Sequence, residues 1–162
     1  MTATRPDWQG NLAALGLELP PVAAPVAAYI PAVRSGNMVY TSGQLPFVRG
    51  ELPCVGKVGE QVSVEQAADA ARLCALNALA AVHDLVGLDN VTRIVKVVGF
   101  VASAPGFTDQ PLVVNGASEL LGSVFGDAGV HARSAVGVTE LPKNSPVEVE
   151  LIVEIGALTQ PA

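Results

Sequence analysis

The segment from His131 to Glu154 reads HARSAVGVTELPKNSPVEVELIVE and is the most informative about the fold. Its second half alternates: positions 147, 149, 151, 153 and 155 are apolar, whereas positions 148, 150 and 154 are glutamates. A period of two predicts a β-strand with one buried face. Residues 132–140 alternate less sharply and predict another strand, and the prolines of segment 141–146 predict a turn between the two. We therefore expect two C-terminal strands joined as a hairpin.

Arg133 is the informative residue of the first strand. Ala135 and Gly137 share its face and leave room for another molecule to approach. A guanidinium group is a planar fork that binds a carboxylate through two hydrogen bonds. The spacing alone leaves two interpretations open. Arg133 is either an edge-strand arginine paired with a nearby glutamate, or an arginine that binds an organic acid.

The expected hairpin also bears on assembly. Its register pairs Glu140 with Val147. Arg133 then lies opposite Glu154, about 20 Å from Glu148 at ~3.3 Å per residue. One chain would be unable to place both Arg133 and Glu148 on one small ligand. If both side chains take part, one of them comes from a neighbouring chain.

Composition limits the class of protein. The 162 residues suffice for one domain, which we assign to residues 1–162 with 1–10 as a loose tail, and half of them are hydrophobic. A net charge of −6 and 4% aromatic residues disfavour a nucleic-acid surface. No signal-like run opens the chain and the longest apolar region, 67–86, carries charges, so we expect a cytoplasmic protein without a membrane partner. Two histidines without zinc spacing and no dinucleotide fingerprint predict no metal and no cofactor.

The remaining elements alternate between strands and helices. In chain order we expect a short helix at 11–17, short strands at 33–34 and 38–41, a helix at 64–86, a strand at 91–102 and a helix from Thr108 or Asp109 to about Phe125. The helix at 64–86 opens with the capping box Ser63-Val-Glu-Gln66 and carries an apolar stripe that ends at Leu85. Because each long helix connects strands, we expect an α+β fold with one mixed sheet and both long helices on one face.

Two motifs give the chain a resemblance to a known family. Residues 131–155 resemble the C-terminal signature of the RidA/YjgF (endoribonuclease L-PSP-like) family, in which an arginine opens a strand and a Leu-Pro turn leads to a strand of alternating Val/Ile and Glu. Residues 36–46, GNMVYTSGQLP, are similar to its N-terminal motif. The resemblance covers residues 29–155, and the segments 56–60 and 109–129 resemble a longer-chain branch of the family.

The resemblance implies a chorismate-mutase-like fold, assembled as a homotrimer with clefts between the subunits. It also implies an activity that needs no cofactor, the hydrolysis of reactive 2-imino or enamine acids to 2-keto acids and ammonia. Arg133 would hold the substrate carboxylate, and Glu148 would act as general base and then as proton donor. The other residues of the implied site are Gly43, Ser42, Tyr29, Asn115 and Ala135, the last at a position where some short members have cysteine.

Two alternatives come from other classes of function. One is a trimeric binding or regulatory protein that takes a small carboxylate in the same clefts without turnover. The other is a ribonuclease or translation inhibitor, a label that the family also carries and that the acidic balance disfavours. His131 stands where many members have proline, on the same side of the strand as Arg133. It either donates to the substrate or packs at a subunit interface, and we expect the packing role.

Overall fold

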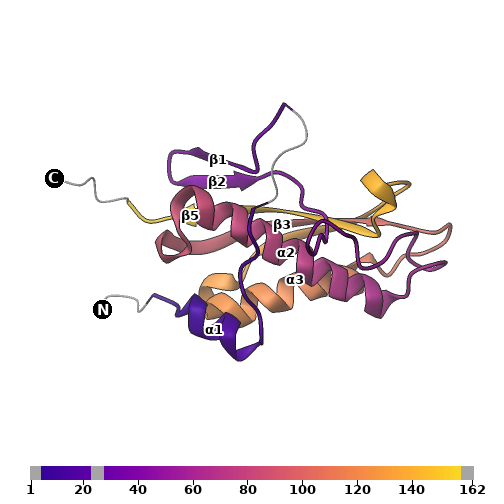
Figure 1. Ribbon diagram of the computed structural model, residues 1–162, viewed down its shortest axis with the longest axis horizontal. Coiled ribbons are helices and arrows are strands. Elements are labelled where there is room, and N and C mark those ends of the chain that lie inside the picture. Colours follow the sequence, from indigo (N-terminus) through magenta and orange to yellow (C-terminus); the bar gives the residue numbers. More distant parts are fainter. Residues whose placement is uncertain (1–4, 23–27, 158–162) are drawn as a thin grey trace.

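The computed structural model describes residues 5–22 and 28–157. In chain order, the helices and strands are α1 (Trp8–Ala14), β1 (Ala32–Ser35), β2 (Met38–Thr41), α2 (Val64–Val86), β3 (Val91–Ala102), α3 (Gln110–Phe125), β4 (Ala132–Val138) and β5 (Val147–Ile155). Short 3-10 turns lie at Leu88–Asn90 (η1), Gly126–Gly129 (η2) and Pro142–Asn144 (η3). The strands form a five-stranded sheet in the order β1-β2-β5-β3-β4. The two long helices α2 and α3 cover one face of it, as predicted (Figure 1).

The pairing within the sheet shows that the expected C-terminal hairpin is wrong. β5 lies between β2 and β3 and is antiparallel to both, whereas β4 runs parallel to β3 on its other side. β3 therefore separates the two C-terminal strands. The physical reason is that β3 is twelve residues long and has two edges of backbone donors and acceptors to satisfy. With β4 on one edge of β3 and β5 on the other, the backbone groups of both edges are paired. The segment that contains η3 connects β4 to β5 across the end of β3.

The two faces of the sheet differ in their cover. The odd-numbered residues of β5, from Val147 to Ile155, face the helices and are at most 1% exposed. Within the described ranges, no helix lies over the opposite face, so apolar side chains remain accessible there: Val33 is 50%, Tyr40 42% and Val136 44% exposed. We call this second surface the open face. It is a sheet surface that carries apolar side chains without a covering layer.

The helix α2 begins as the sequence predicts. The Ser63 hydroxyl accepts a hydrogen bond from the Gln66 N–H (3.1 Å), and the Gln66 side chain accepts one from the Ser63 N–H (3.0 Å). The predicted stripe of Ala67, Ala71, Cys74, Ala78 and Ala81 is buried. Leu85, the expected last member of that stripe, is instead 44% exposed. The alanines bring α2 close to the sheet and to α3.

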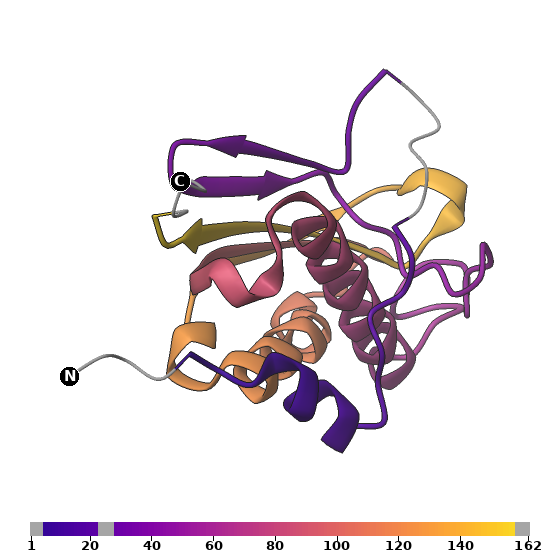
Figure 2. The ribbon, with the colours of Figure 1, turned by 60° about the vertical axis from the view of Figure 1, so that its left-hand side comes forward.

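The N-terminal region differs from the predicted loose tail. α1 begins at Trp8 instead of residue 11, so residues 8–10 are helical, and residues 1–4 of the tail lie outside the described ranges. Asp7 caps the helix by accepting a hydrogen bond from the Gly10 N–H (2.9 Å). The Trp8 side chain is buried, and its indole N–H donates to Asp89 Oδ1 (2.8 Å). Figure 2 shows α1 beside α3, on the side away from the sheet. Among the described residues, no helix has both the length and the apolarity to cross a membrane.

Candidate functional site

Arg133 lies on the helix-covered face of β4, level with Val97 of β3. Its Nη1 donates to Asn115 Oδ1 (2.8 Å) and to Ser118 Oγ (3.2 Å), and its Nη2 donates to the Pro111 carbonyl (3.4 Å). The helix α3 therefore holds one side of the guanidinium group. Within residues 5–22 and 28–157, the Nε–H of Arg133 makes no hydrogen bond. The edge formed by Nε and Nη2 is available to a carboxylate.

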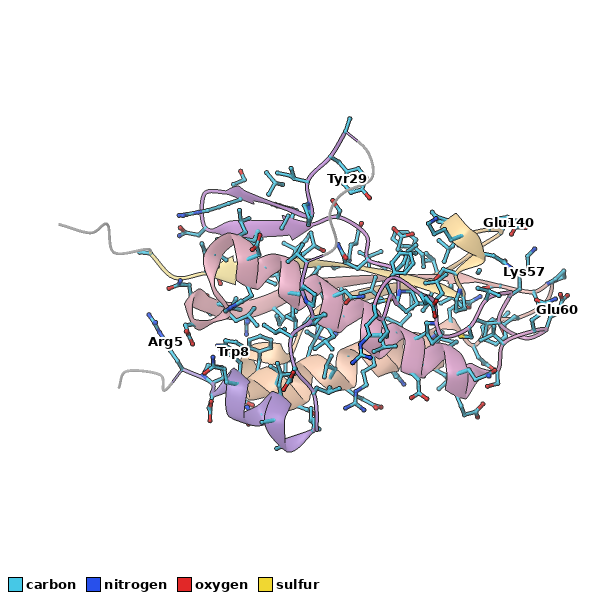
Figure 3. The ribbon with its side chains drawn as sticks, in the orientation of Figure 1. Arg5, Trp8, Tyr29, Lys57, Glu60 and Glu140 are labelled. Atoms are coloured by element: carbon cyan, nitrogen blue, oxygen red, sulfur yellow. The ribbon has the colours of Figure 1, made fainter. Side chains whose placement is uncertain are left out.

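No acid among the described residues neutralises the positive charge of Arg133. The ion pair found among the described residues, with a nitrogen within 4.0 Å of a carboxylate oxygen, joins Lys57 to Glu140 at 3.1 Å. It lies at one end of the molecule (Figure 3). The interpretation that Arg133 pairs with a nearby glutamate is therefore wrong for this part of the chain. A half-buried guanidinium group with an open edge is suited to hold a small organic acid.

A second group of predicted site residues is built around Gly43 and Glu148. Gly43 follows β2, and Glu148 lies near the start of β5 on the open face. A Cβ atom added at Gly43 would collide with the side chain of Glu148, so glycine at this position makes the space in which the carboxylate lies. Both neighbouring amides donate hydrogen bonds within the chain, whereas the Gly43 N–H does not do so among the described residues. It is a free donor beside a carboxylate.

The environment of Glu148 favours proton exchange. Burial raises the pKa of its carboxyl group, and repulsion from the neighbouring Glu150 carboxylate raises it further. A carboxyl group with a raised pKa takes up and releases protons closer to neutral pH than a fully exposed one. This is the property that a general acid–base catalyst needs. Glu148 can therefore supply both a base and an acid within one reaction cycle.

Ser42 anchors the segment that carries Tyr29. The Ser42 hydroxyl donates a hydrogen bond to the Ile30 carbonyl (2.6 Å), so its hydrogen is directed to the chain itself rather than to a ligand. The bond ties the residues next to Tyr29 to the loop that contains Gly43. Tyr29 is 54% exposed and projects on the side of the molecule away from α1 and α3 (Figure 3). Its ring is accessible to a molecule that approaches this loop.

The remaining candidate, Ala135, is the next residue after Arg133 on the same face of β4. It is half-buried and packs against the hydrophobic core, so it offers a small apolar wall beside the guanidinium group. No set of three or more His, Cys, Asp or Glu side chains in the described part of the chain is arranged to hold a metal ion. Cys54 and Cys74 are both free thiols, and Cys74 is buried.

The two groups lie on opposite faces of the sheet. Arg133 is on the helix-covered face, whereas Glu148 alternates with the buried residues of β5 and is on the open face. Along the register, Arg133 is level with Leu151, three positions from Glu148. Two strand spacings of ~4.8 Å and three rises of ~3.3 Å separate their Cα atoms by about 14 Å. The predicted pairing of Arg133 with Glu154 is therefore wrong, but its consequence holds: one chain does not bring Arg133 and Glu148 onto one small ligand.

Three cavities of the described part of the chain lie away from both groups. They have volumes of about 300, 580 and 780 Å³ and are lined chiefly by residues of α1, α2, α3 and the loops. Asn115 borders the smallest of these three and Gln44 the largest, but neither Arg133 nor Glu148 lines any of them. The predicted site is thus divided over two surfaces of the chain, and none of these three cavities joins its halves.

Sequence reasoning missed Ser118. Ser118 lies three residues after Asn115 on α3, and this spacing places the two side chains on one face of the helix. The spacing could have indicated that Ser118 lies beside Asn115 at the site. Sequence reasoning also missed the contacts of His131, whose Nε2 lies 2.9 Å from Ser118 Oγ and whose Nδ1 lies 2.6 Å from the Gly129 carbonyl. Neither of the two roles expected for His131 includes these contacts.

The structure is thus that of an α+β protein with two separate groups of candidate site residues. One is the guanidinium group of Arg133 on the edge strand β4, and the other is the partly buried carboxylate of Glu148 on the open face of the sheet. The family described as "YjgF/chorismate mutase-like, putative endoribonuclease" matches residues 9–155. The chain belongs to this family, which confirms the resemblance and the fold expected from it.

Relatives of this chain have been named from several organisms. The chain is 45% identical over 147 residues to Protein TCP17 of Trypanosoma cruzi, covering 90% of this chain and 92% of that protein. It is 34% identical over 132 residues to a 2-iminobutanoate/2-iminopropanoate deaminase of Dermatophagoides farinae, covering 81% and 88%. It is also similar to the crystal structure of Atu1372, a protein of unknown function from Agrobacterium tumefaciens, with 46% identity, a TM-score of 0.85 and 91% of each chain covered.

Proposed function

We propose that the protein hydrolyses reactive 2-imino acids and their enamine tautomers to 2-keto acids and ammonia, in clefts between the subunits of a homotrimer. The observation that carries the proposal is the open edge of Arg133, with no acid of the described chain beside it, together with a carboxylate of raised pKa at Glu148. The relationship to a named imine deaminase supports the choice of substrate.

The division of the site supports the proposed assembly. Arg133 stands on the edge strand β4, and Glu148 stands on the open face, so two copies of the chain can contribute complementary halves. The exposed apolar side chains of Val33, Tyr40 and Val136 on the open face suit burial against another copy. A contact between two different surfaces of the same chain closes into a ring when the rotation between neighbours is right, and three copies make such a ring.

In the proposed mechanism, the Nε/Nη2 edge of Arg133 pairs with the substrate carboxylate. The Gly43 N–H of the neighbouring subunit donates a hydrogen bond that fixes the orientation of the substrate. Glu148 of that same subunit removes a proton from water as the water oxygen attacks the C=N carbon, and it returns this proton to nitrogen to give a tetrahedral carbinolamine. Glu148 then takes the proton of the carbinolamine hydroxyl and passes it to nitrogen while the C–N bond breaks, which gives a 2-keto acid and ammonia. Positioning and proton transfer suffice because imines react readily with water.

A coupled assay that generates 2-aminoacrylate or iminopropionate tests this proposal. The wild-type protein should accelerate keto-acid formation, and Arg133→Ala and Glu148→Ala should both reduce the rate towards that of buffer. Two other results would replace the proposal. If the wild-type protein is no faster than buffer yet binds 2-oxobutyrate, the protein is a carboxylate-binding protein without turnover. Cleavage of RNA that survives Arg133→Ala would identify it as a ribonuclease.

A further inference from the structure

Behind Arg133, a chain of hydrogen bonds runs away from the open edge of its guanidinium group. Arg133 Nη1 contacts Ser118 Oγ at 3.2 Å, Ser118 Oγ contacts His131 Nε2 at 2.9 Å, and His131 Nδ1 contacts the Gly129 carbonyl at 2.6 Å. All these bonds are partly buried. These hydrogen bonds join β4, α3 and η2. Two of the side chains that make them, Ser118 and His131, take no part in the proposed reaction.

The chemistry of the groups gives these bonds one direction. A carbonyl oxygen can only accept, so His131 carries its hydrogen on Nδ1 and donates it to Gly129. The Nε2 of the neutral ring is then an acceptor, and Ser118 donates its hydroxyl hydrogen to it. With that hydrogen committed, the lone pairs of Ser118 Oγ accept from Arg133 Nη1. Each donor in the chain therefore has one acceptor.

The far end of these hydrogen bonds, at Gly129, is tightly packed. A Cβ atom added at Gly129 would collide with the backbone carbonyl of Leu121 on α3, so only glycine lets η2 pack this closely on the helix. The Gly129 carbonyl is fixed by that packing, and it fixes the ring of His131. Both hydrogens of Arg133 Nη1 are occupied, one by Ser118 and one by Asn115. The guanidinium group is held so that its Nε/Nη2 edge alone is presented.

From this geometry we propose that Ser118 and His131 are positioning residues that orient Arg133 for a substrate carboxylate. The inference rests on the proposed function, because it concerns the same guanidinium group. His131 does not touch the substrate in this account. It orients the Ser118 hydroxyl, which in turn orients Arg133, and both residues act through one path.

A double-mutant cycle in calorimetric titrations with 2-oxobutyrate tests the proposal. Ser118→Ala should weaken binding about 5- to 10-fold, in the range expected for loss of one net hydrogen bond. His131→Leu should weaken it by a similar factor. The double variant should be no weaker than Ser118→Ala alone, because His131 has no path to Arg133 once the hydroxyl is gone. His131→Gln retains an acceptor for the hydroxyl and should bind within about 2-fold of wild type. Ser123→Ala, an exposed serine of the same helix, is the matched control.

Independent effects that multiply in the double variant would overturn the proposal, and so would binding by Ser118→Ala that equals that of Ser123→Ala. The titration with Arg133→Ala separates this result from a failure of the proposed function. If Arg133→Ala binds as well as wild type, the carboxylate role of Arg133 is wrong and the inference falls with it.

A second measurement needs no ligand. Nitrogen-15 relaxation of the Arg133 Nε–H group reports the order of the guanidinium group directly. Its order parameter should fall in Ser118→Ala and in His131→Leu but not in Ser123→Ala. An Arg133 signal that stays as ordered as in wild type in both variants would overturn the positioning role, even if no keto acid binds.

Discussion

Gly43→Ala should separate the activity of this protein from its stability. The backbone of Gly43 does not occupy the left-handed region, so alanine is compatible with it. The three heavy atoms nearest to the new Cβ all belong to the Glu148 side chain. The substitution therefore acts on the proposed catalytic carboxylate and on little else.

The size of the effect follows from the distances. The new Cβ would overlap Glu148 Oε1 and lie 2.7 Å from Glu148 Cδ, whereas ordinary contact begins at 3.4 Å, so the carboxylate carbon must retreat by at least the difference, about 0.7 Å, and the nearer oxygen by more. A misplacement of about 1 Å at a reacting group costs on the order of 100-fold in rate. Because the end of a flexible, partly exposed side chain is what moves, the free energy of unfolding should change by less than about 1 kcal/mol.

The assay compares kcat/KM for imine hydrolysis with the melting temperature of the same preparations. Gly122→Ala is the control: it is a glycine-to-alanine change on the exposed side of α3, with nothing within 4 Å of the new Cβ. It should raise the free energy of unfolding by about 0.5–1 kcal/mol and leave the rate unchanged. Full activity in Gly43→Ala would contradict the role of Glu148, because the position of its carboxylate would then be irrelevant to turnover.

Three further outcomes are expected. Arg133→Ala should raise KM about 10- to 150-fold, the equivalent of a lost hydrogen bond to a charged group, and an unchanged KM in steady-state kinetics would contradict the carboxylate role. Because the pKa of Glu148 is raised in the folded protein, folding favours its neutral carboxyl form. The stability that this preference contributes is fully present below about pH 4.3, the ordinary pKa of glutamate, and is lost as the pH rises through the raised pKa. Glu148→Gln should therefore melt higher than wild type at pH 7 but not at pH 4, and calorimetry that shows the reverse would oppose the assignment. Sedimentation equilibrium should give about three times the 16.5 kDa chain mass, whereas a monomer at micromolar concentration would count against the shared site.

Local patterns predicted most of the elements. The alternation of β5, interrupted at Ile152, and the capping box at Ser63 are signals carried by neighbouring residues, and the structure confirms the strand and the cap. The order of strands is not a local property. β4 and β5 each offer an edge to β3, and nothing in their sequences distinguishes a direct hairpin from two strands that flank a third. The start of α1 was missed for a similar reason, since Trp8 is buried by tertiary contacts and not by a helical period.

The site was predicted in parts. Resemblance to the family pointed to Arg133, Asn115 and Glu148, and the structure brings the first two into direct contact. Their arrangement around the guanidinium group could not be predicted, because Ser118 and His131 meet only when η2 folds back onto α3. Tertiary contacts of this kind leave no periodic trace in a sequence.

The most direct test of the shared site mixes two inactive variants. Arg133→Ala subunits keep Glu148, and Glu148→Gln subunits keep Arg133. When the two are unfolded together and refolded as mixed trimers, each cleft draws its halves from two neighbours. About a quarter of the clefts should then hold both native side chains, and up to that fraction of wild-type activity should return. Mixed trimers that remain as inactive as either variant alone would contradict a site built from two subunits.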